Sequence, residues 1–192
     1  MNRFFVTIIL LSALPFGSNR PWAYSLMAVL VAVSGLYYFT GFYRGEKRVS
    51  NKVLRWPVLF FVLSVVWMLF QTSAWAPSSW QHPFFALTSE ALNVDVVATV
   101  SLWPDQTLDA VMRLLTYGCV FLISFRIHQS EREVSRTLLA VLYAGFAYAL
   151  YGLVLYFQHS NTILWFDAAT SYDVVHSSFI NRNSYATFAG LT

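Results

Sequence analysis

Long apolar stretches bounded by polar residues are the feature of this chain that most restricts its fold. A helix needs about 20 mostly apolar residues to cross the hydrocarbon core of a bilayer. Four stretches are candidates for such a crossing, at residues 22–42, 56–70, 108–127 and 137–157, and a fifth at residues 4–16 is shorter. The sequence therefore predicts an all-α fold, a polytopic integral membrane helix bundle with about five full spans and the start of a sixth near Ser184.

Composition agrees with a membrane protein and argues against other classes. Hydrophobic residues make up 57% of the chain and charged residues 11%, whereas an average soluble domain has roughly 25% charged residues. The net charge of +3 is small. The sequence lacks the basic, aromatic-interleaved pattern that would predict a nucleic-acid partner. Cys119, the single cysteine, forms neither a disulfide framework nor a thiolate metal cluster, and we interpret it as a small packing residue.

The first apolar segment has two interpretations. Arg3 followed by the apolar core at residues 4–14 has the form of a secretory signal. No small-x-small cleavage site follows, because larger or helix-breaking residues occupy that position: Pro15, Phe16, Asn19 and Arg20. We therefore expect an uncleaved first span.

Basic residues in the short connections predict the orientation. Two connections separated by two spans are basic, and they contain Arg44, Lys47, Arg48, Lys52 and Arg55 in one, and Arg126, Arg132 and Arg136 in the other. The opposite connections are richer in acidic residues: Glu90, Asp95, Asp105, Asp109, Asp167 and Asp173. The N-terminus is therefore predicted to face the cytoplasm, and the long connections to face outward.

Two long connections are predicted on the outward side. In residues 76–107, Pro83 is expected to begin a short helix over residues 84–92, and residues 94–102 to be extended, before Pro104 starts the next span. This segment either lies on the outer membrane surface or forms a lid over a lipid-side cavity. The second connection, at residues 158–183, carries His159 and His176 without metal-ligand spacing, so we expect a solvated loop and no metal site.

Three strings along the chain resemble signatures of the O-antigen ligase and O-antigen polymerase superfamily. Residues 179–188 (FINRNSYATF) are similar to the string where a span of these proteins leaves the periplasm. Residues 15–22 (PFGSNRPW) resemble their first outward turn, and residues 101–108 (SLWPDQTL), running into RLL at 113–115, resemble the entry into their fourth span. The strings occur in the family's order, and the resemblance extends over essentially the whole chain.

The resemblance implies a bacterial inner-membrane protein that transfers a glycan from an undecaprenyl-diphosphate carrier on the periplasmic face. Acceptors in the family are lipid A–core, a growing glycan or protein hydroxyls, and no metal or other cofactor takes part. Residues 1–192 would then be a single transmembrane domain, the N-terminal portion of a larger ligase-like domain. The family's large periplasmic loop and its histidine would lie downstream, so we assign a catalytic role to none of the four histidines and expect this portion alone to be inactive.

A lipid diphosphate requires cations at the outer membrane boundary, and Arg182 is the first candidate. Its planar guanidinium pairs with phosphate oxygens and stays charged. Arg182 is expected at the start of a helix, between Asn181 and Asn183, either of which is suited to cap that helix. Backbone N–H groups at a helix start also attract anions. The alternative role is a headgroup anchor.

Asn181 and Asn183, which flank Arg182, and the two arginines Arg113 and Arg20 are the further candidates for the same ligand. Arg113 lies within a span near its outward end, where charge is costly without a partner or a function. Asp109 stands four residues earlier and offers the alternative of a structural ion pair. Arg20 lies in a tight outward turn.

A second class of function remains open, a small polytopic transporter or a scaffold without catalysis. A transporter should place ionisable residues near mid-membrane and carry broken helices in paired positions, and the chain's ionisable residues instead cluster at the outer boundary. Small residues recur four apart in the last full span, at Ala140, Ala144, Gly145 and Ala149. This spacing predicts close helix packing.

Overall fold

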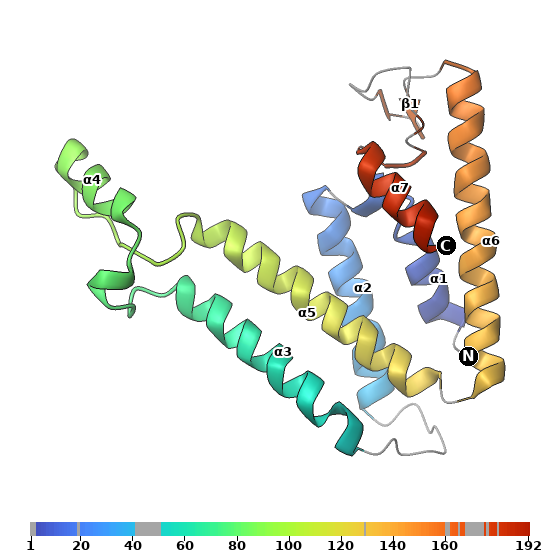
Figure 1. The fold of residues 1–192 in the computed structure, drawn as a ribbon, viewed down its shortest axis with the longest axis horizontal. Coiled ribbons are helices and arrows are strands. Elements are labelled where there is room, and N and C mark those ends of the chain that lie inside the picture. The colour runs from blue at the N-terminus through green and yellow to red at the C-terminus, as the bar shows by residue number, and fades with distance from the viewer. Residues whose placement is uncertain are drawn as a thin grey trace. The chain divides into compact units, whose positions relative to one another are not determined.

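The computed structural model describes residues 3–18, 20–40, 51–128, 130–159, 162–164, 166–167, 175, 177–179 and 181–192. The chain divides into two compact units, of which the first comprises Met1–Lys47 and Leu122–Thr192 and the second comprises Arg48–Phe121. Each unit is described by itself. Figure 1 shows the elements that compose them.

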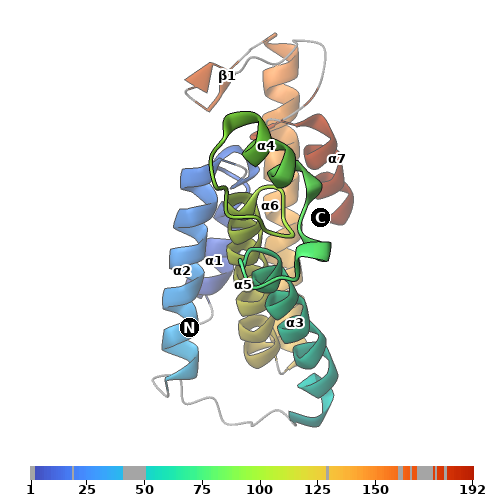
Figure 2. The same ribbon diagram turned by 90° about the vertical axis from the view of Figure 1, so that its left-hand side faces the viewer.

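The first unit is built from helices and one short hairpin. Its elements are α1 (Arg3–Leu11), η1 (Phe16–Ser18), α2 (Pro21–Phe39), the last residues of α5 (Pro104–Ile127), α6 (Glu131–Phe157), β1 (Thr162–Ile163), β2 (Phe166–Asp167) and α7 (Arg182–Leu191). The two strands pair antiparallel, with Ile163 opposite Phe166. α1 contacts both α2 and α6 and lies between them (Figures 1 and 2).

Contacts between these helices define two ends of the first unit. The ring of Phe5 meets that of Tyr38 at 6.3 Å near the end of α2, so α1 runs antiparallel to α2. The Arg126 guanidinium lies 5.4 Å from the ring centre of Phe39, which places the last turns of α2 and α5 together. The start of α1 and the ends of α2 and α5 therefore share one end, as the charge pattern predicts; Arg44, Lys47 and Arg48 lie outside the described residues.

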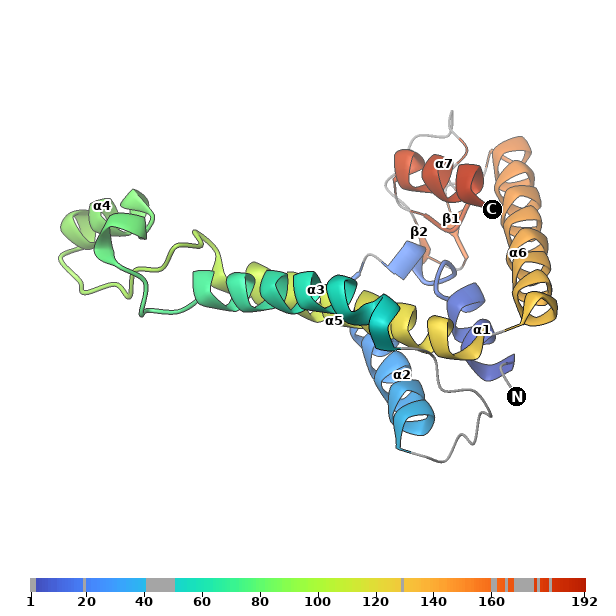
Figure 3. The same cartoon turned by 60° about the horizontal axis from the view of Figure 1, so that its bottom comes forward.

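The second unit is a helical hairpin with a folded connection. It contains α3 (Asn51–Gln71), η2 (Ser78–Trp80), α4 (Pro83–Leu92) and the first part of α5. α3 and α5 run side by side (Figures 1 and 3), and they approach so closely that a side chain at Gly118 would overlap the ring of Phe61. Pro83 and Pro104 begin helices as expected, whereas residues 95–99 have no regular secondary structure.

Among the described residues, four helices are long and apolar enough to cross a membrane: Pro21–Phe39, Lys52–Gln71, Pro104–Ile127 and Glu131–Phe157. The expectation of five full spans is therefore wrong by one. α1 has 9 residues, which makes it about 14 Å long at roughly 1.5 Å per residue, about half of the hydrocarbon core. The helix stops because the chain turns at Ser12, ahead of Pro15 and the left-handed Gly17 (φ 62°). That α7 starts a further span stays a prediction.

Candidate functional site

The entrance of α7 carries the first candidate residues. Asn181 is the N-cap, with extended backbone angles, and its Oδ1 accepts a hydrogen bond from the backbone N–H of Asn183 at 2.8 Å. Of the two predicted capping residues, Asn181 is thus the one that caps. Arg182 is the first helical residue, and its side chain is exposed, as is that of Asn183. Arg182 therefore adds a positive charge to the first turn of α7, whose backbone N–H groups also attract negative charge.

Phe179 joins this entrance to the turn that follows α1 and contains Gly17. Its ring is 8% exposed and lies 6.0 Å from the ring of Tyr185 and 5.2 Å from that of Phe188, both in α7. On its other side it covers Gly17, where any Cβ would overlap the Phe179 ring. Gly17 is also left-handed, a conformation that only glycine adopts without strain. Two of the three family-like strings, about 160 residues apart in sequence, therefore meet at this contact.

Two buried serines hold the segment before α7 in place. Ser177 and Ser178 are both fully buried. The Ser178 hydroxyl donates to the backbone carbonyl of Ala13 at 2.8 Å, and the Ser177 hydroxyl donates to the carbonyl of Tyr148 in α6 at 2.8 Å. The segment is thus bonded both to the turn after α1 and to α6, which fixes the direction in which α7 begins.

Glycines on α6 allow this close approach. A Cβ at Gly152 would lie 3.1 Å from the Cβ of Ser177 and 3.3 Å from the hydroxyl of Tyr185. Gly145 faces Thr192, close enough that a side chain there would overlap it. The ring of Tyr148 packs edge-on against Phe188 at 5.5 Å. Gly145 is thus confirmed as a position of close helix packing.

Arg20 lies near the same contact, and Arg113 belongs to the other unit. Arg20 is the exposed N-cap of α2, and its carbonyl accepts from the N–H groups of Ala23 and Tyr24. Arg20 follows Gly17 by three residues and Arg182 follows Phe179 by three, so each Cα lies within about 11 Å of the contact. Arg113, in the third turn of α5, is half-buried with its Nε shielded from solvent.

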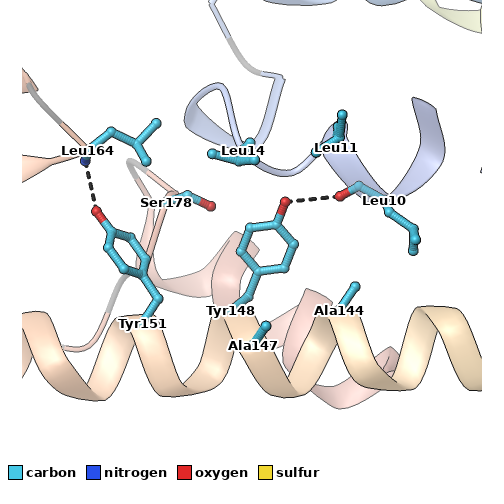
Figure 4. A pocket seen from close by; sticks show the side chains of 9 residues that line it. All are labelled: Leu10, Leu11, Leu14, Ala144, Ala147, Tyr148, Tyr151, Leu164 and Ser178. Carbon is cyan, nitrogen blue, oxygen red and sulfur yellow. Dashed lines mark hydrogen bonds between the residues drawn. The ribbon is translucent and has the colours of Figure 1, made fainter. Parts of the chain in front are cut away.

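A cavity of about 340 Å³ lies beside this contact within the first unit. It is bounded by the end of α1, by one face of α6 and by the segments on either side of β2 (Figure 4). The lining residues are Leu10, Leu11, Leu14, Ala144, Ala147, Tyr148, Tyr151, Leu164 and Ser178. The lining is therefore apolar, except for three hydroxyl groups that already bond within the protein.

Three of the four histidines lie among the described residues. His82 caps α4, where its Nδ1 accepts from the N–H of Phe84 at 3.2 Å. His128 bridges the carbonyl of Ser124 and the hydroxyl of Thr137 at the turn between α5 and α6. His159 is exposed at the end of α6, and His176 lies outside the described residues. Within the described part of the chain, no three His, Cys, Asp or Glu side chains gather to bind a metal ion.

Sequence reasoning missed the residues that build the site. Tyr148 looks like one of many aromatic residues in a span, yet its hydroxyl donates to the carbonyl of Leu10 at 2.9 Å and ties α6 to the end of α1. Gly17 belongs to the string at residues 15–22, and nothing in that string points to Phe179. The sequence does carry a signal for the turn at Gly17: Pro15 stands two residues earlier, and a proline and a glycine at this spacing predict the end of a helix.

The comparisons with known proteins give no relative. No protein-family model matches this chain, and neither a curated protein nor a solved structure is significantly similar to it. The local geometry and the chemistry of the residues therefore carry the functional argument.

Proposed function

We propose that this protein belongs to the apparatus that transfers a glycan from an undecaprenyl-diphosphate carrier at the periplasmic face of the bacterial inner membrane, as O-antigen ligases do. The acceptor would be lipid A–core or another glycan. The observation that carries the proposal is the Gly17–Phe179 contact, because it brings together the two family-like strings that hold Arg20 and Arg182.

The two ends of the first unit support the proposed orientation. Arg126 and the end of α2 lie at one end, and this end continues into the basic connections, which face the cytoplasm under the positive-inside rule. α2 starts next to Arg20 and α7 next to Arg182, at the opposite end. A cytoplasmic N-terminus then exposes both arginines at the outer boundary, the level of a carrier's diphosphate.

The chemistry assigns binding rather than proton transfer to these residues. During glycan transfer the bond from the anomeric carbon to the diphosphate oxygen breaks, and a bond to the acceptor's hydroxyl oxygen forms. The departing diphosphate gains negative charge, which the guanidinium groups of Arg182 and Arg20 and the α7 N–H groups would stabilise. Asn181 and Asn183 shape the helix start. Arg113 remains a candidate for the same anion, and the base that accepts the hydroxyl proton is not assigned.

The alternative class, a small transporter or scaffold, gains less support. A path for a charged or polar solute needs ionisable or polar side chains along it. The cavity of the first unit is lined by leucine, alanine, tyrosine and one serine, none of which is charged at neutral pH. Exposed arginines beside helix starts fit an anionic ligand at the surface better than a route through the membrane.

Replacing Arg182 in the chromosomal gene tests the proposal. We expect Arg182→Ala to lower glycan transfer about 100-fold or more, since a charge-assisted phosphate contact contributes about 3 kcal/mol. Arg182→Lys should retain part of the activity, because it keeps the charge and loses the bidentate geometry. Transfer is measured by gel mobility of the glycan-bearing acceptor, and insertion by cysteine labelling from either side.

Arg55 provides the matched control. It is an exposed arginine predicted at the cytoplasmic end, 5.9 Å from the ring of Trp56, so Arg55→Ala should leave transfer unchanged. Normal transfer by an inserted Arg182→Ala protein would remove Arg182 from the site. Labelling of position 182 from the cytosol would contradict the proposed orientation as well.

A further inference from the structure

We propose that the cavity beside the end of α1 holds one hydrocarbon chain of a lipid. This inference needs only the membrane setting, so it goes beyond the proposed glycan transfer. It starts from the location of the cavity: α1 stops at Leu11, about halfway along a span, and the wall opposite its end is α6, a helix long enough to cross a membrane. The early end of α1 thus leaves space at hydrocarbon depth.

Each hydroxyl group of the wall already makes one hydrogen bond within the protein. The Tyr148 hydroxyl donates to the carbonyl of Leu10 at 2.9 Å, and the Tyr151 hydroxyl accepts from the N–H of Leu164 at 2.9 Å (Figure 4). The Ser178 hydroxyl donates to the carbonyl of Ala13. Water held against these leucine and alanine side chains would find few of the two to four hydrogen-bond partners that it needs, so the apolar lining favours an apolar occupant.

The small side chains of α6 create the space. Ala144 and Ala147 lie on the face that also presents Tyr148 and Tyr151, and these four positions extend over about 10 Å of helix at 1.5 Å per residue. The cavity volume is about 340 Å³, and a cavity of about 150 Å³ accommodates benzene. By proportion it takes about a dozen carbon atoms, which is a segment of a chain and more than a single ring.

The bound hydrocarbon chain belongs either to an ordinary phospholipid or to a polyprenyl carrier, since both lipids have flexible hydrocarbon chains. Ser178, at the cavity wall, precedes Arg182 by four residues. A chain seated here would therefore lie close to the residues to which we assign the diphosphate. The test separates the two sources.

Photo-crosslinking of the purified protein in lipid nanodiscs is the experiment. One sample contains a phospholipid with a diazirine in its acyl chain, and the other contains a polyprenyl phosphate with a diazirine in its prenyl chain. Peptide mass spectrometry then locates the label. We expect label on residues 10–14 and 144–151 in at least one sample. Acyl labelling identifies a bulk lipid and prenyl labelling identifies a carrier, and either supports the proposal.

Filling the cavity supplies the control. Ala144→Phe should reduce the label on residues 10–14 about tenfold, the loss expected when a ring removes about 1.4 kcal/mol of binding. Leu142→Phe places the same ring on the exposed face of α6 and should leave that label unchanged. If Ala144→Phe does not fold, Ala147→Phe fills the more exposed wall of the same cavity.

Two results would overturn the proposal: no label on residues 10–14 from either probe, or label that the cavity-filling variants leave unchanged. These results do not depend on Arg182. Cavity labelling that persists in Arg182→Ala while transfer remains normal would support the cavity and refute the proposed function. Lost labelling with normal Arg182-dependent transfer would do the reverse.

Discussion

The two units use their apolar residues in different ways. In the first unit, α2 buries 28% of its most apolar window, and Phe5, Val31 and Tyr38 are nearly inaccessible. In the second unit, α3 has the higher hydropathy, yet none of its window is buried inside the structure. Lipid tails are as apolar as leucine, so the burial of an apolar side chain in a membrane protein reflects specific packing between helices rather than the hydrophobic effect. The first unit is therefore a packed scaffold for the α7 entrance, and α3 presents its surface to lipid or to further protein.

The connection between α3 and α5 and the connection between α6 and α7 also differ in what they bond to. In the second unit, the connection between α3 and α5 folds on its own helices: the N–H of Ser101 donates to the carbonyl of Gln71, and that of His82 to Thr99. In the first unit, residues 177–179 instead bond to the turn after α1 and to α6. Among the described residues, Ser178 of the first unit's connection bonds to Ala13, 165 residues earlier in the sequence, and two of the three candidate arginines, Arg20 and Arg182, belong to this unit.

The strongest test of this difference compares two glycines that touch a phenylalanine. Gly17→Ala adds a Cβ that overlaps the Phe179 ring, and it does so at a residue with a left-handed backbone. The free energy of unfolding should fall by the sum of two costs: backbone strain of about 1–2 kcal/mol and overpacking of about 1–3 kcal/mol. Gly118→Ala meets only the tip of the Phe61 ring, which can rotate, and should cost about 1 kcal/mol. The free energy of unfolding in bicelles, measured by steric trapping, checks both values. Equal losses would show that the first unit is not more tightly packed than the second.

A second comparison uses two leucines in long spans. Leu155 in α6 is 8% exposed and Leu63 in α3 is 54% exposed. Leu155→Ala should lower the free energy of unfolding by about 2 kcal/mol, at the low end for buried leucines because lipid competes for the same contacts. Leu63→Ala should change it by less than about 0.5 kcal/mol. A large effect at Leu63 would reveal that α3 packs against protein outside the second unit.

Sequence predicted the local elements well and the site only in part. Prolines at 83 and 104 gave the starts of α4 and α5 within a residue, because a missing N–H and a fixed φ are local properties. Apolar length alone overestimated the first segment, since the helix break near Gly17 outweighs its hydropathy. Gly17 and Phe179 belong to strings far apart, and no periodicity within either string signals their contact.

The small residues of α6 were also only partly predictable from the sequence. Their spacing predicted helix packing, and Gly145 and Gly152 do lie against the segment around α7. Ala144, predicted to pack in the same way, and Ala147 instead border the cavity. A small side chain permits either a close neighbour or an empty space, and only the course of α1 decides which of the two occurs.

The smallest expected effect concerns the connection of the second unit, whose Trp80 packs against Trp67 at 6.2 Å and Phe70 at 6.1 Å. Trp80→Ala removes two aromatic contacts of about 0.5–1.5 kcal/mol each, so the amides of His82 and Ser101 should exchange with solvent roughly tenfold faster. The amide of Leu164, which donates to Tyr151 in the first unit, should keep its rate. Trp75→Ala is the matched control, because Trp75 is 92% exposed and its loss should leave all three rates unchanged. Faster exchange at Leu164 in Trp80→Ala would mean that the two connections open together. The connection between α3 and α5 would then not be independent of the connection between α6 and α7.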